Sequence, residues 1–163
     1  MPKILIIDDE KSIRNTLKEI LSYEGYEVTE AQDGIEGLKF VEKDKFDIIL
    51  SDIKMPKMDG IETIQIAKSL YPNIHFIVLT VFDDDDKIFD AIQAGANGYL
   101  LKEDSTIQLV EAIRQAHEGS GAPMSPAIAR KTLLWVKQNL DSHKSSNNYI
   151  LSEREMEILR EVT

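Results

Sequence analysis

At 163 residues the chain is long enough for one full domain and part of another, and its composition of 42% hydrophobic and 29% charged residues is typical of a globular protein in water. It contains no cysteine, which excludes disulfides and thiolate metal sites. No apolar run is long enough to span a membrane and the N-terminus is no signal peptide, so we expect a cytoplasmic protein.

The formal net charge of −10 is unevenly distributed along the chain. Residues 1–118 carry 13 Lys and Arg against 24 Asp and Glu, whereas residues 119–163 carry 6 against 5. An acidic first part repels nucleic acid, so any contact with DNA must come from elsewhere. The change in charge predicts a boundary near residue 119, at the end of a domain of residues 1–119. The rest is predicted to be a linker of residues 120–148, which ends in a polar stretch, and a further segment of residues 149–163.

Five short apolar segments alternate with five segments of helical spacing. The apolar segments predict strands at residues 3–7, 26–30, 47–51, 74–80 and 99–101. Helices between and after them are predicted from apolar residues that recur on one face: Ile13, Leu17, Ile20 and Leu21; Ile35, Leu38 and Val41; Ile64, Ala67 and Leu70; Ile88, Ala91 and Ile92; and Leu109, Ala112, Ile113 and Ala116. This alternation predicts an α/β fold, a doubly wound parallel sheet with helices on both faces.

Four of the predicted strands end in polar or charged residues, namely Asp8-Asp9, Asp52, Thr80 and Lys102. The carboxyl ends of parallel strands share one edge of the sheet, where ligands bind in such folds. Three carboxylates close together repel one another unless a cation neutralises them, and oxygen ligands suit Mg²⁺. A carboxylate beside Mg²⁺, a hydroxyl and an ammonium group is equipped for phosphoryl chemistry, with Asp52 as the attacking group that forms an aspartyl-phosphate.

Asp8-Asp9, Asp52, Thr80 and the run Tyr-Leu-Leu-Lys at 99–102 together resemble a response-regulator receiver domain, over about residues 2–118. The resemblance implies a five-stranded sheet of order 2-1-3-4-5 and a phospho-acceptor switch, not an enzyme, whose Asp52 takes phosphate from a sensor histidine kinase. It also implies that Asp9, Asp52 and the backbone carbonyl of Lys54 bind magnesium, with help from Asp8. Lys102 would bind the phosphoryl group. Thr80 and Tyr99 would be the pair of residues that switches on phosphorylation.

Four positions depart from the family's usual pattern or bear on the phosphoryl lifetime, which varies within the family. Val81 is larger than the usual residue after the switch hydroxyl and is expected to slow phosphorylation by small donors. Glu103 stands where many receivers have proline, which leaves open whether the Lys102–Glu103 peptide is cis. Lys54 and Phe82 occupy positions that tune dephosphorylation in the family, so the sequence leaves the phosphoryl lifetime open.

The linker is predicted to contain a helix at about residues 125–140. Ala129, Leu133, Val136 and Leu140 recur at the spacing of a short coiled coil, so this helix either docks on its own receiver or associates with a second copy. The segment Leu151–Val162, with a capping box of Ser152 and Glu155, resembles the opening helix of the LuxR-type helix-turn-helix in NarL/FixJ response regulators. No recognition helix follows, so we expect a truncated transcription regulator without sequence-specific DNA binding of its own.

Three other classes of protein share parts of the pattern. A haloacid-dehalogenase-like phosphatase also uses a strand-end Asp with Mg²⁺, but it needs an acid two residues later, where this chain has Lys54. A flavodoxin-like cofactor module needs a Ser-, Thr- or Gly-rich phosphate loop in place of Asp8-Asp9-Glu10. A stand-alone receiver acting by protein contact would not need the tail. The preferred interpretation is a two-component response regulator that forms a homodimer on phosphorylation and controls transcription.

Overall fold

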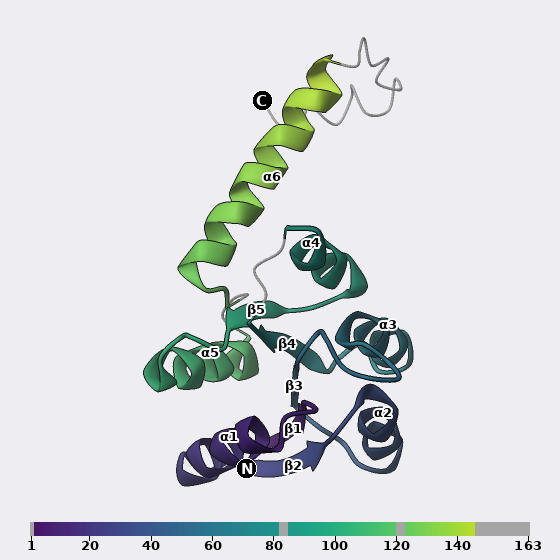
Figure 1. The fold of residues 1–163 in the computed structure, drawn as a ribbon, viewed down its shortest axis with the longest axis vertical. Helices are drawn as coiled ribbons and strands as arrows, with labels where there is room; N and C mark the ends of the chain where they lie inside the picture. The colour runs from purple at the N-terminus through teal and green to yellow at the C-terminus, as the bar shows by residue number, and fades with distance from the viewer. Residues whose placement is uncertain (1, 82–84, 120–122, 146–163) are drawn as a thin grey trace. The chain divides into compact units, whose positions relative to one another are not determined.

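The structure is a computed structural model that describes residues 2–81, 85–119 and 123–145. Five parallel strands form one sheet in the order β2-β1-β3-β4-β5, as predicted (Figure 1). The strands are β1 (Lys3–Ile7), β2 (Glu27–Ala31), β3 (Ile48–Ser51), β4 (His75–Thr80) and β5 (Gly98–Leu101). The helices are α1 (Lys11–Tyr23), α2 (Gly34–Lys43), α3 (Gly60–Leu70), α4 (Asp85–Ala94), α5 (Thr106–Glu118) and α6 (Pro126–Ser145).

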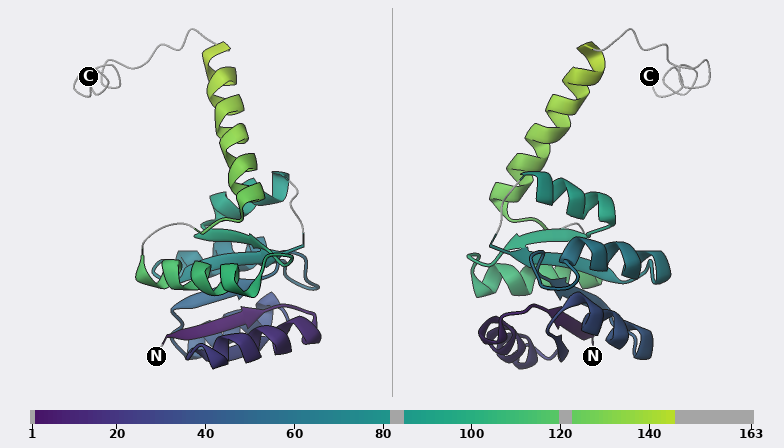
Figure 2. Two further views of the ribbon diagram at one scale, coloured as in Figure 1. Left: turned by 90° about the vertical axis from the view of Figure 1, so that its left-hand side faces the viewer. Right: turned by 45° about the vertical axis from the view of Figure 1, so that its right-hand side comes forward.

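Helices cover both faces of the sheet, which explains why the inner strands are continuously apolar. Helices α1 and α5 pack on one face, and α2, α3 and α4 pack on the other (Figures 1 and 2). Alternate side chains of each strand enter the two cores, so that Ile4 and Ile6 face α1 and α5 while Leu5 and Ile7 face the other layer. Every residue of β3 and β5 is therefore buried, as a parallel sheet between two helix layers requires.

The chain divides into two compact units, Met1–Ala129 and Arg130–Thr163. Helix α6 begins in the first unit and continues in the second. Within the described residues, every helix is too short or too polar to cross a bilayer.

A short segment after α5 pairs with the outer edge of the sheet. The Tyr99 N–H donates to the Pro123 carbonyl at 2.9 Å, and the Ser125 N–H donates to the Tyr99 carbonyl at 3.1 Å. The approach is so close that a Cβ atom at Gly98 would lie 2.7 Å from Pro123. We call residues 123–125 the edge segment; because it occupies the free edge of β5, it makes the start of the tail part of the first unit.

Two expectations differ from the structure. Leu70 was expected to share the inward apolar face of its helix with Ile64 and Ala67, but it is 64% exposed because it is the last residue of α3, where the helix leaves the sheet. Helix α6 continues to Ser145 and not to about residue 140, because the polar residues from Asp141 onward include neither Gly nor Pro to end it. The predicted LuxR-type helix within residues 149–163 lies outside the described residues.

Candidate functional site

The site is built where β1 and β3 end side by side. The Asp52 N–H donates to the Ile7 carbonyl at 3.0 Å, which continues the strand pairing to the first residue after β3. The Asp8 N–H donates to the Ala31 carbonyl at 3.1 Å and so ties the end of β1 to β2. The two Asp residues therefore stand next to each other because the sheet register places them there.

Three predicted metal ligands come together at this edge. Carboxylate oxygens of Asp8, Asp9 and Asp52 all lie within 4.8 Å of one another. Asp8 and Asp52 are buried, whereas Asp9 is exposed, so the cluster is open to solvent on the Asp9 side. We call these three residues the carboxylate cluster.

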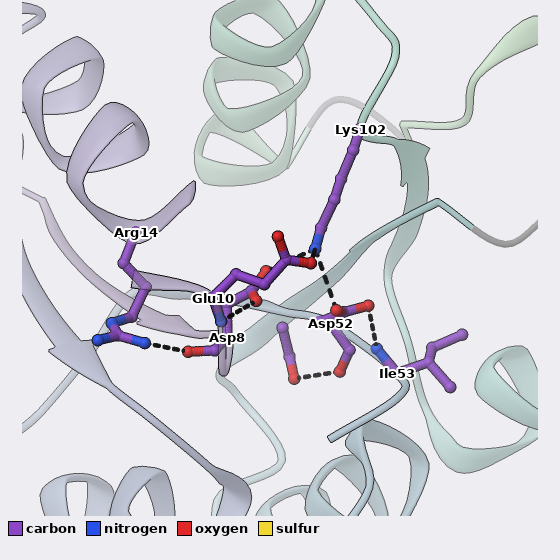
Figure 3. Close-up of polar contacts among 7 residues, drawn as sticks. Asp8, Glu10, Arg14, Asp52, Ile53 and Lys102 are labelled. Atoms are coloured by element: carbon purple, nitrogen blue, oxygen red, sulfur yellow. Dashed lines mark hydrogen bonds and ion pairs between the residues drawn. The ribbon is translucent and has the colours of Figure 1, made fainter. Parts of the chain in front are cut away.

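Lys102 reaches the same cluster from the end of β5. Its Nζ lies 2.8 Å from Asp8 Oδ2, 3.0 Å from Asp52 Oδ2 and 4.0 Å from Glu10 Oε1 (Figure 3). The Lys102 N–H donates to the Thr80 carbonyl at 2.8 Å, which fixes the backbone from which this side chain extends. The lysine therefore bridges the two buried carboxylates of the cluster.

Burial and the neighbouring charges shift the pKa values of Asp8 and Lys102 in opposite directions. Burial raises the pKa of Asp8 above its usual 3.8, although hydrogen bonds from Lys102 and from the Glu10 N–H lower it. For Lys102, burial lowers the pKa, but the hydrogen bonds to Asp8 and Asp52 outweigh burial and hold the pKa above 10.5. Lys102 is therefore held as an ammonium ion, and burial makes the ionisation of Asp8 costly.

Asp52 is fixed by its own loop. Its Oδ1 accepts a hydrogen bond from the Ile53 N–H at 2.8 Å, while Oδ2 faces Lys102. Gly60 packs against the backbone of Asp52, and a Cβ atom there would lie 2.0 Å from the Asp52 carbonyl oxygen. The glycine is therefore needed for this loop to close beside the strand.

Thr80 and Tyr99, the predicted switch pair, are both fully buried. Thr80 is the last residue of β4 and Tyr99 lies on β5, where it pairs with Val78. The alternation along the strands puts both side chains on the sheet face covered by α2, α3 and α4. Tyr99 shares that core with Ile128 from the first turn of α6.

The other singled-out positions surround the site. Lys54 is exposed in the loop after β3, Val81 is 64% exposed and Phe82 lies outside the described residues. The Lys102–Glu103 peptide is trans, as are all peptides of the described ranges. Arg14 and Ser125 are two further buried polar residues near the site that no sequence motif marks; for Arg14 the available signal was a charged residue within an apolar helix face.

The sequence and the fold match one protein family. The family model described as the response regulator receiver domain matches residues 4–114. The chain belongs to the response-regulator receiver family. This family, and neither the phosphatase nor the flavodoxin-like alternative, is the class that the sequence matches.

Relatives of this receiver are transcriptional regulators. The transcriptional regulatory protein LiaR of Bacillus subtilis (strain 168) is 40% identical over 166 residues, which cover 98% of this chain and 75% of LiaR. The uncharacterized transcriptional regulatory protein YhcZ of the same organism is 37% identical over 162 residues, which cover 98% of this chain and 74% of YhcZ. The chain thus spans about three quarters of these relatives.

Solved structures agree with this assignment. A two-component response regulator of the LuxR family from Aurantimonas sp. SI85-9A1 matches with a TM-score of 0.74 and 28% identity, over 79% of this chain and 93% of that chain. A CheY-like receiver domain from Methanospirillum hungatei JF-1 matches with a TM-score of 0.71 and 34% identity, over 73% and 95% of the two chains. The chain is accordingly a receiver of the LuxR/NarL type of two-component response regulator.

Proposed function

We propose that Asp52 accepts a phosphoryl group from a sensor histidine kinase in a magnesium-dependent reaction. The observation that carries this proposal is the placement of Asp52, whose buried carboxylate shares Lys102 with Asp8 and lies within 4.8 Å of Asp8 and Asp9. A nucleophile, a fixed cation and further carboxylates thus meet at one sheet edge.

The residues present fit a magnesium ion. The side chains of the cluster offer only oxygen ligands, and the single Lys102 ammonium leaves the three carboxylates with an excess of negative charge. Mg²⁺ needs only one or two carboxylates and keeps several waters, which suits a cluster open to solvent at Asp9. We propose that Asp8, Asp9, Asp52 and the backbone carbonyl of Lys54 hold the ion, which would supply charge neutralisation on the phosphoryl oxygens.

The chain's own residues account for the transfer step. A carboxylate oxygen of Asp52 attacks phosphorus, an O–P bond forms, the P–N bond to the kinase histidine breaks, and the imidazole leaves. Lys102 offsets negative charge on the phosphoryl oxygens from its position 3.0 Å from Asp52. The Thr80 hydroxyl donates a hydrogen bond to one of those oxygens. Receivers of this kind assist their own phosphorylation but do not turn over a substrate.

The output follows from the switch pair. Movement of Thr80 toward the phosphoryl group, with the Tyr99 ring held inward behind it, changes the surface formed by α4, β5 and α5. We propose that this change drives homodimerisation in the cytoplasm, and that it controls transcription through a LuxR-type DNA-binding region as in the relatives named as transcriptional regulators.

The test is phosphorylation by a small donor. Wild-type protein incubated with Mg²⁺ and phosphoramidate should gain the mass of one acid-labile phosphoryl group, and Asp52→Asn should gain none. Asp90→Asn, which changes an exposed carboxylate on α4, is the matched control and should behave as wild type. Phosphate on Asp52→Asn equal to that on wild type would contradict the proposal, and steady hydrolysis of many phosphate esters would favour the phosphatase alternative.

A further inference from the structure

Arg14 is a buried cation beside the carboxylate cluster, and the proposed function gives it no part. It lies on the inner side of α1 and is only 8% exposed. Its Nη1 donates to the backbone carbonyl of Asp8 at 2.6 Å (Figure 3), and its Nε lies 3.6 Å from Glu30 Oε1. Burying a guanidinium group is costly unless its donors are used, and here Nη1 is used on the backbone of Asp8 while Nε faces the Glu30 carboxylate.

The carbonyl that Arg14 binds belongs to the peptide unit between Asp8 and Asp9. A peptide unit is planar, so fixing the direction of this carbonyl fixes where the chain leaves toward Asp9. The Asp8 N–H is already tied to the Ala31 carbonyl, so Asp8 is held on both sides of its backbone. Among the described residues the Asp9 side chain has no hydrogen bond or ion pair to hold it, so the position of its carboxylate depends on where this backbone leads.

Glu30 anchors the other side of the guanidinium group. It lies on β2 opposite Ile6 of β1, and it is 25% exposed. Lys18, one turn further along α1 and half exposed, also approaches Glu30, at 3.4 Å. Arg14 therefore connects the rigid sheet to the Asp8–Asp9 peptide, whereas Lys18 contacts the same glutamate without touching the cluster.

We propose that Arg14 is a positioning residue that orients the Asp8–Asp9 peptide so that the Asp9 carboxylate joins Asp8 and Asp52 in binding Mg²⁺. This inference rests on the proposed magnesium site. The charge of Arg14 by itself opposes binding of a cation, so removing it should tighten Mg²⁺ binding if electrostatics alone mattered. Loss of positioning should instead weaken Mg²⁺ binding, because residues that orient metal ligands typically contribute 10- to 100-fold in metal affinity.

The experiment compares Arg14→Gln with Lys18→Gln, which removes a charge from the same glutamate but no contact with Asp8. Mg²⁺ binding is followed by the amide NMR shifts of Asp9 and Glu10 in unphosphorylated protein. We expect Arg14→Gln to weaken Mg²⁺ binding by roughly tenfold or more, and Lys18→Gln to leave it within about twofold of wild type. With phosphoramidate, Arg14→Gln should raise the half-saturating Mg²⁺ concentration by the same factor and leave the rate at saturating Mg²⁺ close to that of wild type.

A second measurement needs no metal. The Glu10 N–H donates to Asp8 Oδ1 at 2.9 Å, so a loosened Asp8–Asp9 peptide should speed hydrogen exchange at this amide in chelator-treated Arg14→Gln but not in Lys18→Gln. If Arg14→Gln does not fold, Arg14→Lys serves instead, because it keeps the charge but lacks the planar fork that serves Asp8 and Glu30 together. It should also weaken Mg²⁺ binding.

Equal or tighter Mg²⁺ binding by the Arg14 variant, or unchanged exchange at Glu10, would overturn the role of Arg14. A wild-type protein that binds no Mg²⁺ and accepts no phosphate would instead overturn the proposed function. The two failures are therefore distinguishable in one set of samples.

Discussion

Lys102 and Asp8 form a buried ion pair at the centre of the site. The Lys102 ammonium lies 2.8 Å from Asp8 Oδ2, and both side chains are more than nine-tenths buried. Removing one partner of a buried ion pair usually costs about 3–5 kcal/mol of stability, because the other charge is left without compensation. A bound cation at the carboxylate cluster would restore part of that compensation.

The first prediction concerns the protonation of Asp8 in magnesium-free protein. Because burial raises the pKa of Asp8 above 3.8, the free-energy cost of ionising it is absent below that pH and grows as the pH rises through the higher native pKa. In urea unfolding we expect the wild-type protein to lose stability as the pH rises through this range. Asp8→Asn should not show this loss, because its side chain cannot ionise. A carbon-13 NMR titration should give Asp8 a midpoint above 3.8, and Lys102→Gln should raise it further. A midpoint at or below 3.8 would contradict the account.

The second prediction concerns Gly60, which lets the loop close on Asp52. In Gly60→Ala the new Cβ would meet the Asp52 carbonyl oxygen at 2.0 Å, so the backbone must shift. We expect a loss of about 1–3 kcal/mol in unfolding free energy and a clear drop in phosphorylation rate. Gly25→Ala is the control: its φ of +95° makes it strained by about 1 kcal/mol, but nothing lies within 4 Å and it is remote from the site. Equal phosphorylation in both variants would count against the role of Gly60.

At the scale of elements, the edge segment joins the switch strand to the start of α6. Ser125 Oγ accepts the Leu101 N–H at 3.1 Å and also bonds the Asp104 carboxylate. Leu101 precedes Lys102, and Tyr99 pairs with the edge segment through both of its backbone groups. The residues that the proposed switch depends on are thus held by the segment that leads into the second unit.

The third prediction tests this attachment. Ser125→Ala removes a buried hydroxyl with two hydrogen-bond partners and should cost about 1–2 kcal/mol in unfolding free energy. Ser69→Ala, an exposed serine that bonds one backbone carbonyl, should change it by less than about 0.5 kcal/mol. The measurement is urea unfolding of the two variants side by side. Equal effects would show that the edge segment contributes no more than a surface contact.

The sequence predicted the elements whose signal is local and missed those that depend on the tertiary fold. Apolar strands that end at Asp8 and Asp52 were readable because a doubly buried strand needs an unbroken apolar run. The edge segment was not, since Pro123–Ser125 has no alternation of its own and only β5 gives it a partner. Arg14 had a local signal for burial, its position on an apolar helix face, but its carbonyl partner had none, because that partner is set by the turn after β1.

The whole molecule is expected to change its association state on activation. The fourth prediction is that beryllium fluoride with Mg²⁺, which mimics the phosphorylated state, shifts the protein from monomer to dimer in sedimentation. Asp52→Asn should stay monomeric under the same conditions. If α6 supplies the contact, Leu133→Gln with Leu140→Gln should abolish the dimer. These two residues of the predicted coiled coil are 71% and 58% exposed and so are available to a second copy. A dimer that forms equally without beryllium fluoride would show that dimerisation does not depend on the phosphorylated state.

The most direct test of the central claim is to find where the phosphoryl group is attached. Borohydride reduces an aspartyl-phosphate to homoserine, so phosphorylated protein treated in this way and digested should carry one modified residue, at position 52. Chelation of Mg²⁺ before the donor is added should abolish the modification. A modified residue at Asp8 or Asp9, or the same yield without Mg²⁺, would contradict the account.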